Sequence, residues 1–437
     1  MFQIETPGNF LFTTWEGGGS VTPALTVAAK LVARGHRVRV MSDRSNRPEA
    51  EASGARFIPW TRAPSRPDRS RATEILHDWD VAEPIDGLGR LVEEIMAGPA
   101  LAYAQDVMEE LRREPADLVV SSEMLPGVSA GCEALGQRLA LLAVNVSIFP
   151  LPGIPPLGPG LRPPRNAKEQ AEHGEIRAQT IAYFDRWLPK LNAARAALGL
   201  APLASLAEHP FRCEKLLLAT ARAFDFAPRR VHRKVAYVGP QIGEPAWAQP
   251  WRLPRPANDS RPMVAVCFST TFQNHVDVLQ RIADAIAMLP LRAVITLGDT
   301  ISTSELNVGE SVALVHSAPH NTLMEQADLV VTHGGHGTVI RALMHRRPML
   351  VIPHGRDQND NAVRVTERLA GLSLSQDASA AAIADAVSRL RTDPRFAKGA
   401  RALGDRVAAE AEQSPVVAML ESLANLGAGQ QPRQCIA

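Results

Sequence analysis

The chain has 437 residues, of which 45% are hydrophobic and 21% charged, and this composition indicates a globular protein of two or three domains. A formal net charge of +1 provides no long-range basic field, which argues against nucleic acid or an acidic membrane as a partner. No apolar run reaches the ~20 residues of a membrane span, and the N-terminus does not resemble a signal peptide. The four cysteines are far apart, which argues against a zinc site or disulfide framework and fits the cytoplasm: Cys132, Cys213, Cys267 and Cys435.

The chain begins with the pattern of a parallel βαβ unit. An apolar run from Phe10 to Thr14 predicts a strand, and three glycines at 17–19 predict a turn. A helix is expected from Pro23 to Ala33, because proline suits the first turn of a helix and Gly35 ends the pattern. The next strand is expected from His36 to Met41.

The second half of the chain repeats this order. A strand is expected from Met263 to Phe268, a helix from Val276 to Met288 and a strand from Ala293 to Leu297. The pentapeptide A-D-L-V-V also occurs twice, at 116–120 and 327–331, each time before a polar loop. These correspondences predict two Rossmann-like α/β domains, joined by the proline-rich segment 240–262. The alanine-rich end, roughly 389–426, is predicted to be helical.

The stretch 327–361 carries the clearest functional pattern. A short apolar run, Leu329 to Val331, predicts a buried strand, which is followed by a glycine turn and a helix that opens at Thr338. The start of such a helix presents free N–H groups and a partial positive charge, both of which suit phosphate. His333 and Thr338 flank this helix start, and Asp357 and Gln358 follow the next strand at the same edge of the sheet. A phosphate-binding turn beside polar side chains that can bind hydroxyls indicates a nucleotide sugar as ligand.

The segments H-G-G-H-G-T, from His333 to Thr338, and G-R-D-Q, ending at Gln358, resemble the donor-binding signature of glycosyltransferase family 1. The similarity is to UDP-glycosyltransferases and, more closely, to bacterial natural-product and macrolide glycosyltransferases. It implies the GT-B fold, in which two Rossmann-like α/β domains face each other across a cleft. The implied divisions are an acceptor-binding domain at 1–239, a linker at 240–262, a donor-binding domain at 263–405 and a returning C-terminal helix at 406–437.

The resemblance also implies where the nucleotide sugar binds. The glycine turn would hold the diphosphate, Asp357 and Gln358 the sugar hydroxyls, and the backbone near Ala318 the base. Ser317 stands where the family has a stacking tryptophan, and His336 either faces the phosphates or fills the turn. The implied donor-binding residues are Thr270, Thr271, Ala318, His320, His333, Gly335, His336, Gly337, Thr338, Asp357 and Gln358.

The sequence departs from the family at the catalytic base. Most members carry a histidine three residues before the proline of the first helix, where this chain has Ser20. A serine hydroxyl does not accept a proton at neutral pH unaided. Two carboxylates are alternative bases: Glu16 in the loop after the first strand, and Glu123 after the strand that contains A-D-L-V-V. Each is equally consistent with a solvated loop residue.

Two long stretches are expected to be irregular and to form the acceptor cleft, Ile58 to Asp86 and Phe149 to Leu191. Their aromatic residues either line that cleft or pack under the loops: Trp60, Trp79, Phe149, Phe184 and Trp187. The D-W-D triplet at 78–80 has the form of a metal-binding motif of other glycosyltransferases. Because those have a different fold, we interpret it as loop, and as potential lining of the acceptor site.

We therefore expect an inverting, metal-independent transferase without a bound cofactor. Its co-substrate would be a UDP- or dTDP-sugar and its acceptor a small lipophilic natural product, polyketide, phenol or macrolide. Two alternatives stay open, a nucleotide-sugar epimerase of the same fold and a catalytically silent helper of a partner transferase. The oligomeric state is left open between monomer and homodimer.

Overall fold

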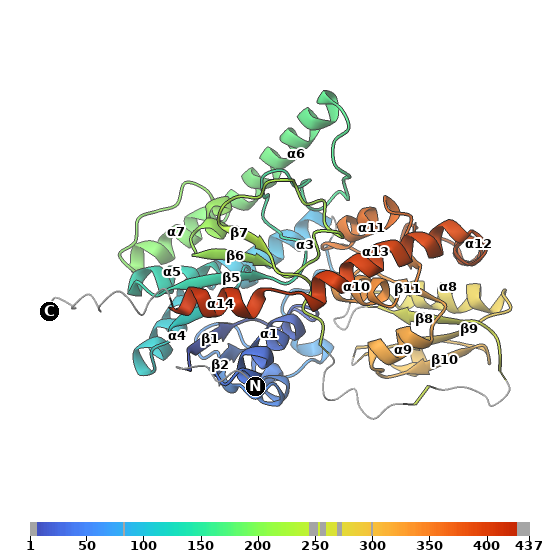
Figure 1. Cartoon of the computed structure of the whole chain (residues 1–437), viewed down its shortest axis with the longest axis horizontal. Helices are drawn as coiled ribbons and strands as arrows, with labels where there is room; N and C mark the ends of the chain where they lie inside the picture. The colour runs from blue at the N-terminus through green and yellow to red at the C-terminus, as the bar shows by residue number, and fades with distance from the viewer. Residues whose placement is uncertain are drawn as a thin grey trace.

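The computed structural model describes residues 7–81, 84–243, 252–253, 259–268, 273–298 and 300–425. Within these ranges the chain forms two parallel sheets, one of seven and one of six strands, each covered by helices (Figure 1). We call the seven-stranded sheet with its helices the first half and the six-stranded sheet with its helices the second half. The linker predicted at 240–262 lies largely outside the described residues.

The first half has the strand order β3-β2-β1-β4-β5-β6-β7. Its strands are β1 Asn9–Thr13, β2 Arg37–Ser42, β3 Arg56–Pro59, β4 Leu118–Ser122, β5 Leu139–Ala143, β6 Lys215–Leu218 and β7 Val235–Tyr237. Alternate side chains of β1 enter different cores, since successive residues of a strand point to opposite faces. Phe10 and Phe12 pack with α1 (Val21–Ala33), whereas Leu11 packs with α4 (Ala100–Arg113) and α5 (Pro126–Leu135).

The second half has the strand order β10-β9-β8-β11-β12-β13, so its first strands are arranged as in the first half. Its strands are β8 Met263–Cys267, β9 Arg292–Thr296, β10 Val312–Val315, β11 Leu329–Thr332, β12 Met349–Val351 and β13 Gly371–Ser373. The repeated pentapeptide leads into β4 in one half and β11 in the other. These two strands occupy equivalent positions, each beside the first strand of its sheet. The prediction of two Rossmann-like arrays is confirmed.

Helices cover both faces of the second sheet. Val264 and Val266 of β8 pack with α8 and α12, and the intervening Ala265 packs with α10 and α13. The helices of this half are α8 Val276–Ala287, α9 His320–Gln326, α10 His336–Met344, α11 Gln358–Thr366, α12 Ala380–Thr392 and α13 Pro394–Glu412. In the first half, α2 spans Arg47–Ala52, and α3 (Pro84–Leu91) runs into a π-helical turn, Val92–Ala97.

The expectation that 149–191 is irregular is wrong. This stretch contains α6 (Ala167–Asp185), which projects from the body of the molecule (Figure 1), and the start of α7 (Leu188–Ala197). Its aromatic residues Phe149 and Phe184 lie in a hydrophobic core, as Trp60 does elsewhere in the first half. Core packing therefore accounts for these three rings. The periodicity of α6 is weak because most of its side chains are exposed, so the sequence lacks an apolar stripe.

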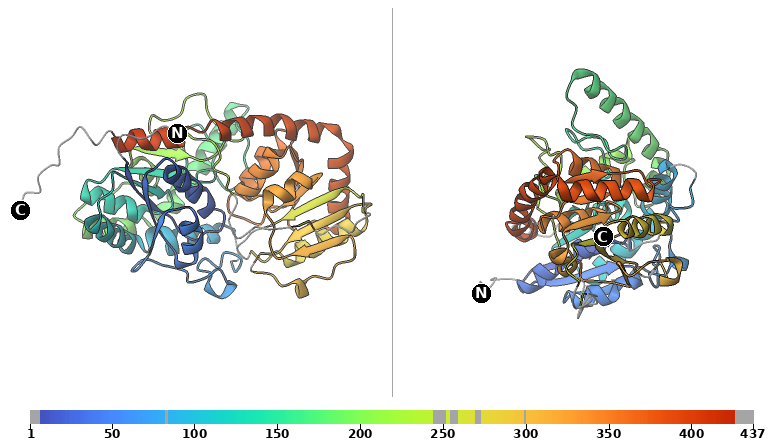
Figure 2. Two further views of the ribbon diagram at one scale, coloured as in Figure 1. Left: turned by 60° about the horizontal axis from the view of Figure 1, so that its bottom comes forward. Right: turned by 90° about the vertical axis from the view of Figure 1, so that its right-hand side faces the viewer.

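The C-terminal segment joins the two halves. The helix α13 packs on α10, and α14 (Val416–Asn425) packs on α1, so both helices run along one side of the molecule (Figure 2, left). Position 406, where a returning helix was expected to begin, lies inside α13. The chain crosses back at 413–415, where Ser414 and Pro415 interrupt the helical pattern that the alanine-rich sequence suggested.

One set of contacts between the two halves lies around α11. Asp225, which follows β6, is buried and accepts hydrogen bonds from Arg364 Nε at 3.0 Å and Nη2 at 2.7 Å. The hydroxyl of Tyr237 donates to the same carboxylate at 2.5 Å, and Asp360 Oδ2 accepts from the amide of Gly158 at 2.7 Å. The bonds from Arg364 to Asp225 and from Gly158 to Asp360 join the two halves, and the Arg364–Asp225 pair is buried. Tyr237 belongs to the first half and holds Asp225 in place for this pair.

Substitution of Asp225 by Asn is expected to destabilise the protein by about 3–5 kcal/mol, because it leaves the buried guanidinium of Arg364 without its counter-charge. Urea unfolding measures the change. Asp405→Asn is the matched control, since Asp405 pairs with Arg346 at the surface, where both side chains are 51% exposed. Loss of such an exposed ion pair should lower the free energy of unfolding by about 1 kcal/mol or less. Equal stability of the two variants would contradict this assignment.

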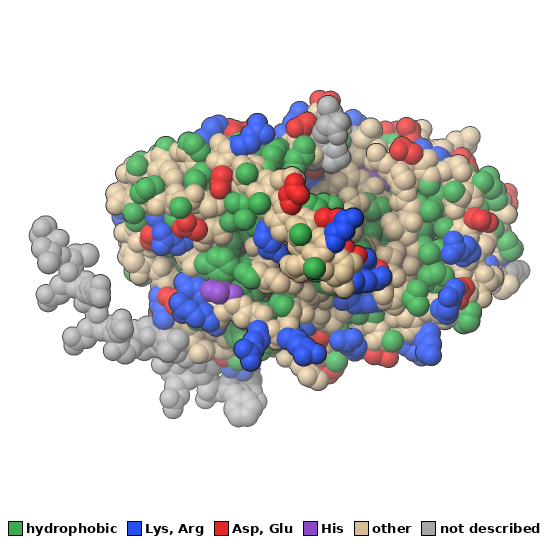
Figure 3. Space-filling view, turned by 90° about the horizontal axis from the view of Figure 1, so that it is seen from above, with side chains coloured by type: hydrophobic (Ala, Val, Ile, Leu, Met, Phe, Trp, Pro, Cys, Tyr) green, Lys and Arg blue, Asp and Glu red, His purple; other side chains and the backbone are tan. Residues whose placement is uncertain are grey.

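Charged side chains of both signs are interspersed on the face seen from above (Figure 3). Among the described residues, no helix combines the length and apolar composition needed to cross a membrane. The three described cysteines, Cys132, Cys213 and Cys267, are buried thiols.

Candidate active site

The predicted site residues gather at the carboxyl ends of the strands. In open parallel sheets ligands bind at this edge, where the strand order reverses. In the second half that point lies between β8 and β11, which pair directly, and in the first half it lies between β1 and β4. His333 follows β11 and Gln273 follows β8, while Glu16 and Glu123 follow β1 and β4.

A glycine turn links β11 to α10. Gly334 has φ +97°, and a Cβ there would lie 2.7 Å from Val351 Cγ1, so both backbone conformation and space require glycine. Gly335 is the N-cap, and α10 begins at His336, two residues before the predicted start. A Cβ added to Gly337 would meet no described atom within 4 Å, apart from its chain neighbours and the backbone of its own helix. The Thr338 amide donates to the Gly335 carbonyl at 3.1 Å. Helix geometry leaves the amides of His336 and Gly337 without an acceptor in their own helix, and open space lies beside Gly337.

The imidazole of His333 lies across this turn. Its Nε2 would be 2.5 Å from a Cβ placed on Gly335, and the residue is 8% exposed. Burial lowers the pKa of His333 to about 3, and His275, His354 and Arg356 act in the same direction. The ring is therefore neutral at pH 7 and carries one N–H donor.

Two further histidines, which were not identified from the sequence, lie together with His333 around the ring of Phe268. The centroid of Phe268 lies 5.7 Å from that of His333, 5.8 Å from His275 and 5.6 Å from His354. Burial lowers the pKa of His275 to about 4, with His354 adding to the effect, and burial also lowers the pKa of His354. The position of His354 directly after β12 was a usable signal, whereas only the fold brings His275 here.

Asp357 and Gln358 are held by hydrogen bonds at the start of α11. Asn361 Nδ2 donates to Asp357 Oδ2 at 2.9 Å and to the Gly334 carbonyl at 2.8 Å, which ties the glycine turn to α11. Gln358 Oε1 accepts from the His354 amide at 2.6 Å, and its Nε2 donates to Gln273 at 3.0 Å. Burial raises the pKa of Asp357. The sequence did not identify this bridging role of Asn361.

The other predicted donor residues have different surroundings. The ring of His336 faces the first half, where its Nε2 lies 2.9 Å from Thr220 Oγ1, and burial lowers its pKa to about 4. Ala318 is buried beside the end of β10, and His320 begins α9, with its pKa lowered to about 3 by burial and by Arg341. Thr338 is buried in α10. Thr270 and Thr271 lie outside the described residues.

Of the candidate bases, Glu16 is engaged in an ion pair. Its Oε2 accepts from Arg69 Nε at 2.9 Å, and its Oε1 accepts from the Gly18 amide at 2.8 Å. Ser20 lies at the N-cap of α1, where its hydroxyl donates to the Trp15 carbonyl at 3.4 Å. The structure thus holds Glu16 as a paired carboxylate and Ser20 against the backbone.

Glu123 is in a different environment. Its Oε2 accepts from the Ser147 hydroxyl at 2.9 Å, and its Oε1 accepts from the Ile148 amide at 3.2 Å. Burial raises the pKa of Glu123 to about 7, although both hydrogen bonds act against the shift. A carboxyl with this pKa exchanges protons readily at neutral pH. It was predicted to lie at this edge, but its link to Ser147 was not.

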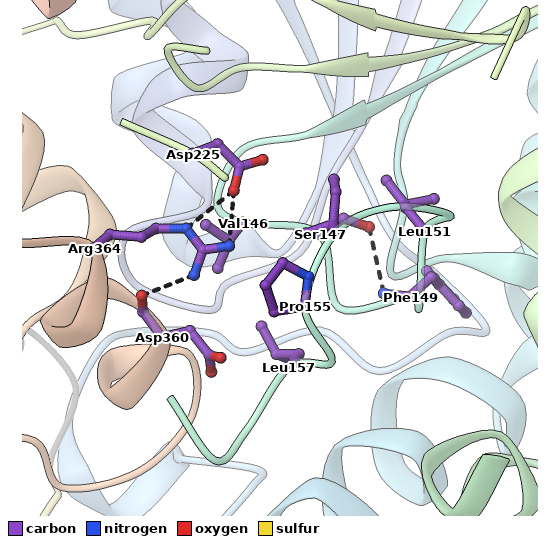
Figure 4. Close-up of a pocket in the computed structure, with 10 residues that line it drawn as sticks. Val146, Ser147, Phe149, Leu151, Pro155, Leu157, Asp225, Asp360 and Arg364 are labelled. Atoms are coloured by element: carbon purple, nitrogen blue, oxygen red, sulfur yellow. Dashed lines mark hydrogen bonds and ion pairs between the residues drawn. The ribbon is translucent and has the colours of Figure 1, made fainter. Parts of the chain in front are cut away.

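Ser147 lines a small cavity between the two halves, about 10 Å³ in volume, roughly the room that one water molecule needs. The first half contributes apolar walls, including Phe149, Leu151 and Leu157, and the second half contributes Asp360 and Arg364 (Figure 4). Glu123 is therefore connected through one hydroxyl to the junction of the halves.

Comparisons with known proteins identify relatives of this chain. Residues 280–423 match the family described as "Erythromycin biosynthesis protein CIII-like, C-terminal domain". The chain is 28% identical over 425 residues to 4'-demethylrebeccamycin synthase of Lentzea aerocolonigenes, which covers 94% of this chain and 99% of that protein. It is 26% identical over 424 residues to oleandomycin glycosyltransferase of Streptomyces antibioticus, covering 94% and 89%.

Solved structures show the same fold. The glycotransferase of kitacinnamycin superposes with a TM-score of 0.75 at 19% identity, over 96% of this chain and 100% of that one. Glycosyltransferase VinC, solved in complex with dTDP, superposes with a TM-score of 0.63 at 18% identity, over 96% and 100%. The GT-B fold and the resemblance to natural-product glycosyltransferases are confirmed.

Proposed function

We propose that this chain, which has the GT-B fold and resembles natural-product glycosyltransferases, transfers a sugar, with inversion and without a metal, from a dTDP- or UDP-sugar to a small lipophilic acceptor in the cytoplasm. The dTDP bound to one structural relative favours dTDP. The observation that carries the proposal is the open space beside Gly337 at the start of α10, next to the turn over which His333 lies.

The diphosphate is assigned to this space for an electrostatic reason. When the anomeric bond breaks, the leaving nucleoside diphosphate gains negative charge. Helix N–H groups and an imidazole N–H fixed beside that charge stabilise the transition state more than the ground state. The donors keep their positions throughout because Asn361 ties the turn to α11. In this mechanism, His336 acts by joining the halves through Thr220.

The sugar is assigned to the rim formed by the loop before α11. Oδ2 of Asp357 accepts a hydrogen bond from Asn361, and Oδ1 is the oxygen that we assign to a sugar hydroxyl. Each polar atom of the Gln358 amide can make a second hydrogen bond. Hydrogen bonds to the sugar hydroxyls fix the anomeric carbon, so that the acceptor attacks it from the side opposite the leaving diphosphate.

Glu123 is the base in this mechanism, acting through Ser147. The acceptor hydroxyl gives its proton to Ser147 Oγ as that oxygen passes its own proton to Glu123 Oε2, so charge moves onto the buried carboxyl. Val146 and Phe149 provide apolar walls beside Ser147, and the cavity there, about 10 Å³ in volume, admits the acceptor hydroxyl and not the acceptor as a whole. Glu16 is less suited to this role, because its carboxylate is already engaged by Arg69 and by the Gly18 amide.

Thermal unfolding with added nucleotide tests the donor class. A ligand that binds only the folded protein at about 100 times its Kd stabilises it by about 2.7 kcal/mol, which corresponds to a rise of several degrees in Tm. We expect this rise with dTDP or UDP and no rise with GDP at equal concentration. If none of the three nucleotides changes the Tm, the donor assignment fails.

The two alternative functions, epimerase and silent helper, predict different behaviour with a nucleotide sugar. An epimerase would convert dTDP- or UDP-sugar when no acceptor is present, and chromatography of the nucleotide sugars would show it. A silent helper would bind no nucleotide sugar. Turnover that requires acceptor and releases one nucleoside diphosphate per glycoside formed contradicts both alternatives.

A further inference from the structure

A loop of the first half reaches the proposed donor rim of the second. Asp78 Oδ2 accepts a hydrogen bond from Arg356 Nε at 2.6 Å, and Trp79 packs against the core formed with α8 and α12. Arg90 in α3 clamps the loop by donating to the carbonyls of His77 at 2.7 Å and Asp80 at 2.9 Å. The D-W-D triplet is therefore a fixed bridge between the halves.

Arg356 brings this contact next to the predicted sugar-binding residue. It lies between Gly355, with φ +138°, and Asp357, and its own φ is +53°. A left-handed conformation is unfavourable for arginine and persists only where surrounding contacts impose it. Asp78 supplies one such contact. A chain of bonds continues from Asp357 through Asn361 to the carbonyl of Gly334, so Asp78 is linked to the glycine turn.

The second carboxylate oxygen of Asp78, Oδ1, has no hydrogen-bond partner in the part of the chain that the structure describes. The side chain is only 10% exposed, and Oδ1 is buried without a hydrogen bond from any described residue. A buried carboxylate oxygen left without a donor is costly, and such atoms in native proteins commonly mark a functional position. The rim thus contains a hydrogen-bond acceptor that no described residue satisfies.

We propose that Asp78 is a donor-binding residue contributed by the first half: Oδ2 holds Arg356 and the adjoining Asp357 in place, and Oδ1 accepts a hydrogen bond from a hydroxyl or amino group of the donor sugar. This inference rests on the proposed function, because it assigns a further contact to the same nucleotide sugar. It also gives the two halves a shared site, so that a bound sugar connects them.

Calorimetric titration with dTDP and dTDP-glucose tests the contact, since only the second ligand carries a sugar. Asp78→Asn is expected to weaken dTDP-glucose binding about tenfold or more and to leave dTDP binding within about twofold of the wild type. Asp80→Asn is the matched control, as Asp80 lies in the same loop with an exposed side chain. It should leave both affinities unchanged.

A second set of variants separates the two roles of Asp78. Arg356→Gln removes the ion pair and leaves Oδ1 intact, and the double variant should show a non-additive loss if both residues act on one sugar contact. The inference is overturned if Asp78→Asn binds dTDP-glucose as tightly as the wild type, or if it weakens dTDP and dTDP-glucose equally. Failure of the wild type to bind either ligand, or the UDP equivalents, would instead remove the proposed function itself.

Discussion

Replacement of Glu123 by Gln is expected to lower kcat/KM by about 10²–10⁴-fold, the usual contribution of a general base. Glutamine has the same size but cannot take the proton that Ser147 passes on. In the wild type, kcat/KM should rise with pH and level off above about 7, because burial raises the pKa of Glu123 to about 7 and only the ionised form is a base. Initial rates across this pH range measure both effects.

Stability provides an independent measurement on the same variant. The folded pKa of Glu123 is above its ordinary value of 4.5, so the folded state favours the protonated form. The stability that this preference contributes is complete below about pH 4.5 and is lost as the pH rises through 7. The variant stays neutral. Between pH 4 and pH 8 its free energy of unfolding should therefore gain about 3 kcal/mol relative to the wild type.

Two substitutions serve as comparisons for Glu123. Ser147→Ala removes the relaying hydroxyl and should reproduce most of the loss in kcat/KM, whereas Glu94→Gln changes an exposed glutamate and should change nothing. If Glu123→Gln retains activity and Glu16→Gln abolishes it, the base is Glu16, and the ion pair with Arg69 must open in the complex.

Replacement of His333 by Ala is expected to lower kcat by about 10²–10³-fold, as the loss of one fixed donor to a developing negative charge does in other enzymes. The loss should be nearly constant between pH 5 and pH 9, because the pKa of His333 is lowered to about 3 and the ring stays neutral over that range. Steady-state rates with saturating donor measure it.

The control for His333 is His232→Ala, which changes an exposed histidine between β6 and β7. His333→Asn should recover part of the activity, because its amide restores an N–H donor. A His333→Ala variant that turns over at the wild-type rate would show that the imidazole does not act on the leaving diphosphate. Circular dichroism of the three variants verifies that their overall helix content matches that of the wild type.

The sequence was most informative about the second half. The run of β11, the glycine turn and α10 depends on contacts between residues close in the chain, so its order was readable within two residues. The structure then showed that neighbours in the motif have different surroundings. His333 lies over the turn, whereas His336 points to Thr220 in the first half. No local pattern distinguishes these two histidines, because the difference depends on where the first half docks.

The sequence by itself determined the two Rossmann-like arrays, the glycine turn and the type of ligand that this turn suits, because periodicity, glycine spacing and strand-end polarity are local properties of the chain. Only the tertiary structure decided that Glu123 is bonded to Ser147 whereas Glu16 is paired with the cation Arg69. Neither contact is local in the sequence, since Ser147 lies 24 residues from Glu123 and Arg69 lies 53 residues from Glu16. The tertiary structure alone also paired Asp78 with Arg356, 278 residues apart. A side chain's pKa and partners depend on what the fold packs around it, and that packing comes from distant parts of the chain.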